Sequence, residues 1–129
     1  MSVPKSHRKP SIYDPADQAQ RLFDYINDIF IKVYSFSPQK ANAYLCRPVR
    51  LSIEVLEYVV KYIEGYASLK EEYRHRAYDS LNALDVIIEE LIVDNNLLTY
   101  YDGRKTRGVT YHELKEISET IEHLMILLH

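Results

Sequence analysis

Residues 14–33 of this chain read DPADQAQRLFDYINDIFIKV, and the apolar residues among them recur at steps of three and four. Residues with that spacing share one face of an α-helix. Asp14 can accept hydrogen bonds from the first turn, and Pro15 suits the first helical position. The sequence therefore predicts an amphipathic helix that ends near Ser37. Its apolar stripe consists of Ala19, Leu22, Phe23, Ile26, Ile29, Phe30 and Val33.

A second helix is predicted between Ser37-Pro38, which repeats the cap and proline, and Gly65, which closes the segment. Pro48 lies inside this segment. Because proline lacks a backbone N–H, we expect a kink or a late helix start near it. The stripe of this segment consists of Leu45, Val49, Ser52, Val55, Leu56, Val59 and Ile63.

Two further helices are expected, each opened by a capping box, which is a serine or threonine followed three residues later by glutamate. Ser68 with Glu71 opens one, and Thr110 with Glu113 opens the other, after a loop that holds Asp102-Gly103. The first of these stripes consists of Tyr73, Ala77, Leu81, Leu84, Ile88 and Leu91. The second consists of Leu114, Ile117, Ile121, Leu124 and Leu128.

No segment alternates apolar and polar residues as a half-buried strand does. The expected fold is all-α, an antiparallel up-down four-helix bundle over residues 14–129, preceded by a basic, flexible N-terminal arm over residues 1–13. The 129 residues suit one domain, and 47% hydrophobic with 27% charged residues exclude a wholly disordered chain.

The chain is expected to be cytoplasmic, without a membrane partner. No run of about 18 apolar residues suggests a membrane span. The basic start of the chain lacks the apolar stretch of a secretory signal. Cys46 is the single cysteine, so it cannot form an internal disulfide, which fits a reducing compartment.

The net charge of -3 conceals separated charges. Residues 1–13, 37–52 and 103–109 each carry three basic residues and no acid, whereas residues 79–102 carry six acids and no lysine or arginine. Clustered basic residues favour salt-sensitive contact with phosphates, although a solvated surface is the usual role of such clusters. The acidic stretch could meet a basic protein surface.

Catalytic chemistry has little support in the sequence. Glu72 and His75 have the Glu-x-x-His spacing of di-metal bundles, but no second such pair occurs, and Arg74 and Arg76 would repel a cation. An exposed helix face explains the pair better. Cys46 lies beside Arg47, but no histidine has an evident pairing with it. We therefore predict no catalytic residues, no metal site and no cofactor.

Tyrosine is unusually common, with twelve residues and no tryptophan. Tyr58, Tyr62, Tyr66 and Tyr73 cluster around the turn between the second and third predicted helices. Tyrosine suits interfaces because it joins an apolar ring to a hydrated hydroxyl. The alternative for any one of them is a place in the outer core of the bundle.

The order of these features resembles a family of bacterial four-helix-bundle proteins. The family includes the accessory variability determinant of diversity-generating retroelements and the proteins encoded in intervening sequences of large-subunit ribosomal RNA genes. The segments that carry the resemblance are Ser6-His7-Arg8-Lys9, Phe36-Ser37-Pro38-Gln39-Lys40, Arg47 with Arg50 and Ser52, Lys70-Glu71-Glu72-Tyr73-Arg74-His75-Arg76, and Tyr111-His112-Glu113-Leu114.

The resemblance implies a homopentameric barrel without an active site, which binds a reverse transcriptase and its structured template RNA to support mutagenic cDNA synthesis. It implies nucleic-acid contacts from Arg8, Lys9, Arg47, Arg50, Arg74 and Arg76. The acid-free clusters add Lys5, Lys40, Arg104, Lys105 and Arg107. Two alternatives remain open: a protein-protein adaptor of the same family without a nucleic-acid role, and an enzyme built inside the bundle.

Overall fold

The computed structural model describes residues 14–102 and 105–129, with the backbone alone for Ala67, Asn95, Asn96 and residues 100–102 and 105–107. The predicted arm, residues 1–13, lies outside this part of the chain. The elements are α1 (Pro15–Phe36), α2 (Pro38–Tyr44), α3 (Cys46–Glu64), α4 (Ala67–Val93), the short 3₁₀ helix η3 (Asn95–Leu98), β1 (Thr99–Asp102), β2 (Lys105–Gly108) and α5 (Tyr111–Leu127).

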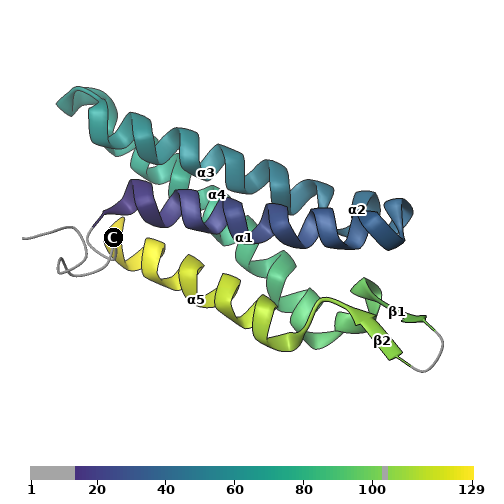
Figure 1. The fold of residues 1–129 in the computed structure, drawn as a ribbon. Coiled ribbons are helices and arrows are strands. Elements are labelled where there is room, and N and C mark those ends of the chain that lie inside the picture. Colours follow the sequence, from purple (N-terminus) through teal and green to yellow (C-terminus); the bar gives the residue numbers. More distant parts are fainter. Residues whose placement is uncertain (1–13, 103–104) are drawn as a thin grey trace, which may run out of the picture.

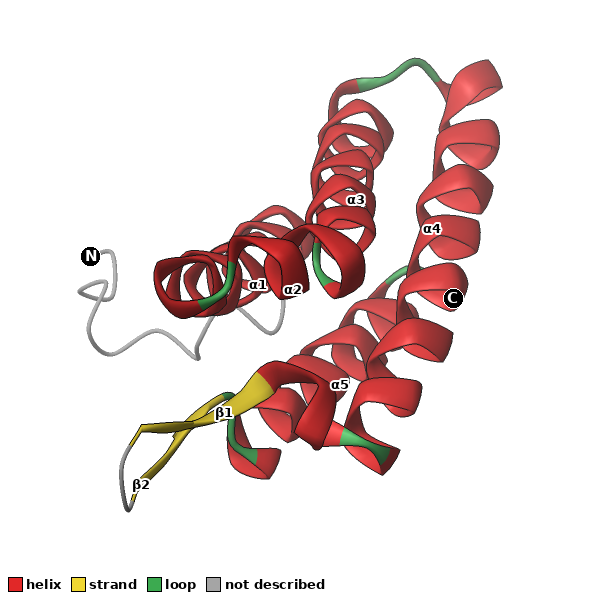
Figure 2. Ribbon diagram, turned by 90° about the vertical axis from the view of Figure 1, so that its right-hand side faces the viewer, coloured by secondary structure: helices red, strands yellow, loops and turns green. Residues whose placement is uncertain are grey.

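The described helices form a bundle in which α1 packs against α3 and α5, and α4 packs against the same two helices (Figures 1 and 2). The core lies where these four helices meet, and each contributes one stripe of buried side chains. The largest fully buried side chains are Leu22, Ile26, Leu45, Leu81, Leu84, Ile88, Leu98, Leu114, Ile117, Ile121, Leu124 and Leu128.

Most of the predicted helix boundaries are confirmed. The Asp14 carboxylate accepts hydrogen bonds from the N–H groups of Ala16 and Asp17. The Ser37 hydroxyl accepts one from the N–H of Lys40 and so opens α2. At the start of α5, Thr110 and Glu113 form the predicted capping box. These bonds satisfy backbone donors that a helix start otherwise leaves without a partner.

The predicted disturbance near Pro48 is a break between α2 and α3 at Leu45. In a continuous helix the N–H of residue 48 would bond the carbonyl of Tyr44, and proline has no such N–H. The bonds on either side persist, from the N–H of Leu45 to the carbonyl of Ala41 and from the N–H of Val49 to the carbonyl of Leu45. The helix is therefore interrupted only at Leu45 and resumes at Cys46.

The prediction that Ser68 caps the third helix is wrong. Ser68 does not cap a helix, because α4 begins at Ala67 after an extended Tyr66, and this cap position makes no side-chain hydrogen bond. The Glu71 carboxylate, which was expected to complete that cap, is bound by Arg74 instead.

The region between α4 and α5, predicted to be a loop, contains an antiparallel hairpin of β1 and β2. Its signals were the aromatic and β-branched residues on either side of Asp102-Gly103, a pair typical of hairpin turns. At the base of the hairpin, Gly108 pairs with Thr99 and has φ +136°. A Cβ there would lie 2.2 Å from the carbonyl oxygen of Leu98, so only glycine fits.

The buried stripes follow the prediction closely on α4 and α5 and less closely on α3. Leu45, Val55 and Val59 are buried, whereas Ile63 is 44% exposed. None of the helices in residues 14–102 and 105–129 is both long and apolar enough to cross a membrane.

The core accounts for the stability of the bundle, and Leu81→Ala tests this. Leu81 is fully buried in α4, so we expect the truncation to lower the free energy of unfolding by about 2–5 kcal/mol. Urea denaturation followed by circular dichroism measures the change. Val86→Ala on the same helix is the control: Val86 is 60% exposed, and its truncation should change stability by at most about 0.5 kcal/mol.

Candidate nucleic-acid interface

Lys40 links α2 to the hairpin formed by β1 and β2. Its Nζ donates a hydrogen bond of 2.7 Å to the backbone carbonyl of Thr99, the first residue of β1. The contact places Lys40, which belongs to the basic cluster of residues 37–52, at the end of the bundle that carries β1 and β2 (Figure 1). Because the ammonium group already binds this carbonyl, Lys40 has a structural role and is less available to bind phosphate.

Arg47 and Arg50, unlike Lys40, have no structural contact of this kind within the described residues. Both are exposed in the first turns of α3 and lie three residues apart, so they share one side of the helix. Within the described residues, neither side chain makes an ion pair or a hydrogen bond. Two guanidinium groups held on a rigid helix with their donors free can bind phosphate oxygens in a forked geometry.

Arg74 is a structural arginine. Its guanidinium donates to both oxygens of the Glu71 carboxylate, with the closest pair 2.8 Å apart, and to the carbonyl of Leu128 at 2.7 Å. The hydrogen bond from Arg74 holds the pKa of Glu71 below its ordinary value. Since α5 is about 25 Å long, Leu128 lies far from the hairpin, and Arg74 does not join Arg47 and Arg50.

Arg76 is likewise neutralised. Its guanidinium donates to Glu72 at 2.7 Å and lies over the ring of Tyr58, 5.9 Å from the centroid. The contact with Tyr58, followed by the charge of Glu72, raises the pKa of Arg76. The cluster over Lys70–Arg76 therefore presents less free positive charge than the sequence suggests.

The side chains of the remaining predicted contacts lie outside the described part of the structure. Lys5, Arg8, Lys9 and Arg104 lie outside the described residues. Lys105 and Arg107 are in β2, where the backbone register pairs them with Asp102 and Tyr100. The structure thus brings the strand that carries Lys105 and Arg107 to the same end of the bundle as Lys40.

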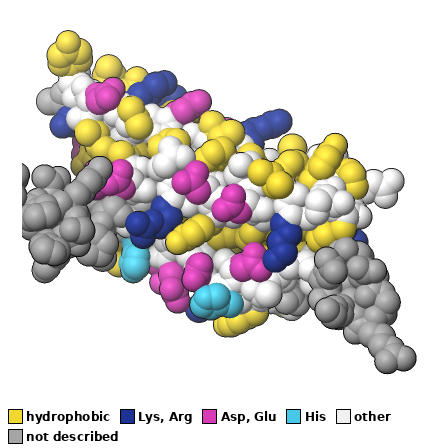
Figure 3. All heavy atoms as spheres, viewed as in Figure 1, with side chains coloured by type: hydrophobic (Ala, Val, Ile, Leu, Met, Phe, Trp, Pro, Cys, Tyr) yellow, Lys and Arg dark blue, Asp and Glu magenta, His cyan; other side chains and the backbone are white. Residues whose placement is uncertain are grey.

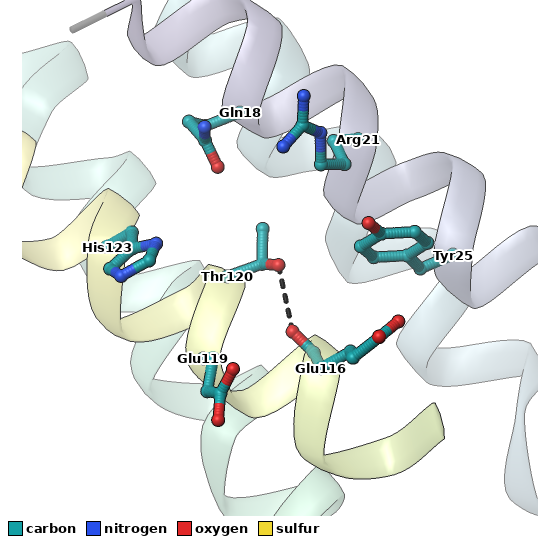
Figure 4. A pocket seen from close by; sticks show the side chains of 7 residues that line it. All are labelled: Gln18, Arg21, Tyr25, Glu116, Glu119, Thr120 and His123. Carbon is teal, nitrogen blue, oxygen red and sulfur yellow. Dashed lines mark hydrogen bonds between the residues drawn. The ribbon is translucent and has the colours of Figure 1, made fainter. Parts of the chain in front are cut away.

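A polar groove of about 270 Å³ separates α1 from α5 on another part of the surface (Figure 4). Gln18, Arg21 and Tyr25 project into it from α1. Four residues of α5 face them: Glu116, Glu119, Thr120 and His123. Gln18 and Thr120 are buried, whereas the ionisable groups lie along the rim. The rim carries charges of both signs, so the groove has no net attraction for phosphates.

This groove lacks the arrangement of an activated nucleophile. The Thr120 hydroxyl donates to the carbonyl of Glu116 in its own helix, at 2.8 Å, rather than to a base. Glu116 is paired with His112, with 3.0 Å between carboxylate oxygen and Nε2. Elsewhere Cys46 is a free, exposed cysteine.

The Glu-x-x-His pair lies on an exposed face of α4. Both Glu72 and His75 are exposed, and the Glu72 carboxylate is occupied by Arg76. Across residues 14–102 and 105–129, no group of three or more histidine, cysteine, aspartate or glutamate side chains is arranged to hold a metal ion.

Sequence reasoning missed two electrostatic features that join helices. Lys32 of α1 forms an ion pair of 2.9 Å with Glu113, at the start of α5. Asp85 of α4 is partly buried near Glu89 and Glu122, and burial followed by these two negative charges raises the pKa of Asp85. The Lys32–Glu113 pair has no signal in local spacing, because its partners are 81 residues apart. Asp85 and Glu89 are local neighbours on α4, whereas the approach of Glu122 from α5 is not local.

Comparison of the chain with models of protein families, with curated proteins and with solved structures gives no match.

The Lys32–Glu113 pair predicts a pH-dependent contribution to stability. Burial raises the pKa of Glu113, but hydrogen bonds from Lys32 and Thr110 outweigh it, so the pKa lies below its ordinary 4.5. A carboxyl with a lowered folded-state pKa stabilises the fold above its unfolded pKa. That contribution disappears as the pH falls through the folded-state value.

Glu113→Gln isolates this charge, since glutamine also serves at the third position of a capping box. We expect the variant to lose about 0.2–1 kcal/mol at neutral pH, because both partners are partly exposed, and to match the unmodified protein at a pH below the lowered pKa. Urea unfolding across pH measures this, with exposed Glu119→Gln as the control. A deficit of the same size at acid pH would show that the cap, not the charge, is responsible.

Proposed function

We propose that this chain is a non-enzymatic accessory protein of a diversity-generating retroelement, which binds a reverse transcriptase and structured template RNA in the cytoplasm. The resemblance of its ordered segments to that family motivates the proposal. The free arginine pair on α3, Arg47 and Arg50, is the observation that carries the RNA-binding part. Phosphate contacts of this kind give affinity and orientation with little reading of base sequence.

The proposal includes an up-down four-helix bundle assembled as a homopentameric barrel. Counting α2 and α3 as one bent helix, the neighbours of α1 are α3 and α5, and α4 has the same two neighbours, which fits a four-helix bundle. Light scattering at micromolar concentration tests the assembly, and a monomer would contradict the barrel.

The second candidate is a protein-protein adaptor of the same bundle type without a nucleic-acid role. The engagement of Lys40, Arg74 and Arg76 within the fold favours it, because it removes three of the predicted phosphate ligands. The net charge of -3 also favours it, since RNA would be repelled at long range.

The double variant Arg47→Gln with Arg50→Gln distinguishes the two candidates. With the full chain and a structured RNA, fluorescence anisotropy across a salt series should give weaker binding for the variant. The slope of log affinity against log salt should become less negative by about 1.4–1.8, the change expected on losing two phosphate contacts. Lys115→Gln, an exposed basic position on α5, is the matched control and should change neither quantity.

Failure of the unmodified chain to bind RNA at low salt would leave the adaptor as the function. Equal weakening by Arg47→Gln with Arg50→Gln and by Lys115→Gln would show that binding follows total charge and not this site.

A further inference from the structure

The helix α3 carries a second apolar stripe, beside the one buried in the core. Its members recur at steps of three and four and are Val49, Ile53, Leu56, Val60 and Ile63. Ile53 is 41% exposed and Ile63 is 44% exposed, while the other three are half-buried. A surface helix of a soluble bundle needs one apolar stripe. Val49 and Leu56 pack against the core, so the apolar residues of α3 that the fold leaves without this role are Ile53, Val60 and Ile63.

The neighbouring helix α1 repeats this feature. Its second stripe consists of Phe23, Phe30, Ile31 and Tyr34, with the polar Asn27 between them. The rings of Phe30 and Tyr34 are stacked with centroids 5.8 Å apart, and Ile31 is 58% exposed. A stacked aromatic pair on the surface forms a broad, rigid apolar area with little conformational freedom to lose on binding.

The two second stripes together form one surface, which we call the α1–α3 face. The helices α1 and α3 pack side by side, and in the space-filling view hydrophobic side chains gather over both of them (Figure 3). An exposed apolar area that spans two helices marks an interaction surface more often than isolated exposed residues do.

Carboxylates lie along both borders of the α1–α3 face. Asp24 and Asp28 lie beside the α1 stripe, and Glu57 and Glu64 lie beside the α3 stripe. All four are exposed, and within the described residues none forms an ion pair; Asp24 accepts one hydrogen bond, from Gln20. Figure 3 shows acidic side chains next to the hydrophobic ones over these helices.

The nearby basic groups do not cancel this charge. The Lys61 ammonium lies over the ring of Tyr73, 5.6 Å from the centroid, so it is directed toward α4. Arg50 lies on the same side of α3 as Glu57, seven residues on, and is one basic group beside the four carboxylates. The border of the face is therefore predominantly negative, and its complement is an apolar stripe flanked by lysine or arginine.

We propose that the α1–α3 face binds a basic amphipathic helix of a partner protein, with its apolar residues against Ile31, Tyr34 and Ile53 and its basic residues against the four border carboxylates. A second copy of this chain fits less well, since a symmetric contact through this face would oppose like charges. The inference deepens the protein-binding part of the proposed function and rests on that part alone.

A synthetic helical peptide tests the proposal with the full chain. The probe has about 18 residues, roughly five helical turns, with leucine at steps of three and four and lysine on both flanks. Its matched control carries glutamate in place of every lysine. We expect fluorescence anisotropy to show binding of the lysine peptide that weakens with salt, and much weaker binding of the glutamate peptide.

Two pairs of variants locate the binding site. Ile31→Ser with Ile53→Ser should weaken the lysine peptide on the order of tenfold or more, because both exposed side chains contact the probe. The control, Val86→Ser with Val93→Ser on α4, changes side chains at least as exposed and should have no effect. Asp28→Lys with Glu57→Lys should weaken binding and reduce its salt dependence, whereas Glu119→Lys on α5 should do neither.

Three outcomes would overturn the proposal: equal binding of the two peptides, equal weakening by the α4 control, or no peptide binding together with dissociation of an assembly by Ile31→Ser and Ile53→Ser. The last result would assign the face to a second copy of the chain. RNA binding measured on the same variants separates this inference from the proposed RNA role, because Arg47 and Arg50 are unchanged in them.

Discussion

The burial of one apolar stripe from each of α1, α3, α4 and α5 is the constraint on which the rest of the structure depends. Because one face of each helix is buried in the common core, any binding surface must lie on the helix faces that remain exposed. On α4 and α5 the exposed large apolar residues, such as Val86, Val93 and Ile126, are scattered and do not form a stripe. On α1 and α3 the remaining faces include a second apolar stripe, and this difference between the helices gives the bundle a distinct side on which a partner can dock.

Ion pairs and hydrogen bonds within the fold decide which charges remain available to a ligand. Arg74 joins α4 to the end of α5, Lys40 joins α2 to β1, and Lys32 joins α1 to the start of α5. Each contact uses a cation that composition alone would count toward RNA binding. Arg47 and Arg50 retain that capacity because they are exposed on α3 and form no ion pair within the described residues, so the proposed interface is smaller than the number of basic residues indicates.

Helix positions were predictable because their causes are local. Capping at Asp14, Ser37 and Thr110 and the missing N–H of Pro48 act within one turn, and periodicity revealed the core stripes. The hairpin was missed because its strands are short and follow no apolar alternation. Ile63 was misassigned because a single stripe cannot be separated from two adjacent stripes without the neighbouring helix. The neutralisation of Arg74 depends partly on Leu128, far away in the chain, which sequence reasoning does not reach.

The central claim is that one bundle carries two separate binding surfaces, a pair of free arginines and an acidic-bordered apolar face. Nuclear magnetic resonance of the full chain tests it most directly, by observing the isoleucine methyl groups and the arginine side chains in one sample. The account predicts that a lysine-flanked helical peptide shifts Ile31, Ile53 and Ile63, and that a structured RNA shifts Arg47 and Arg50 instead. Shifts of the same residues by both ligands, or of core residues such as Ile117 and Ile121 alone, would contradict it.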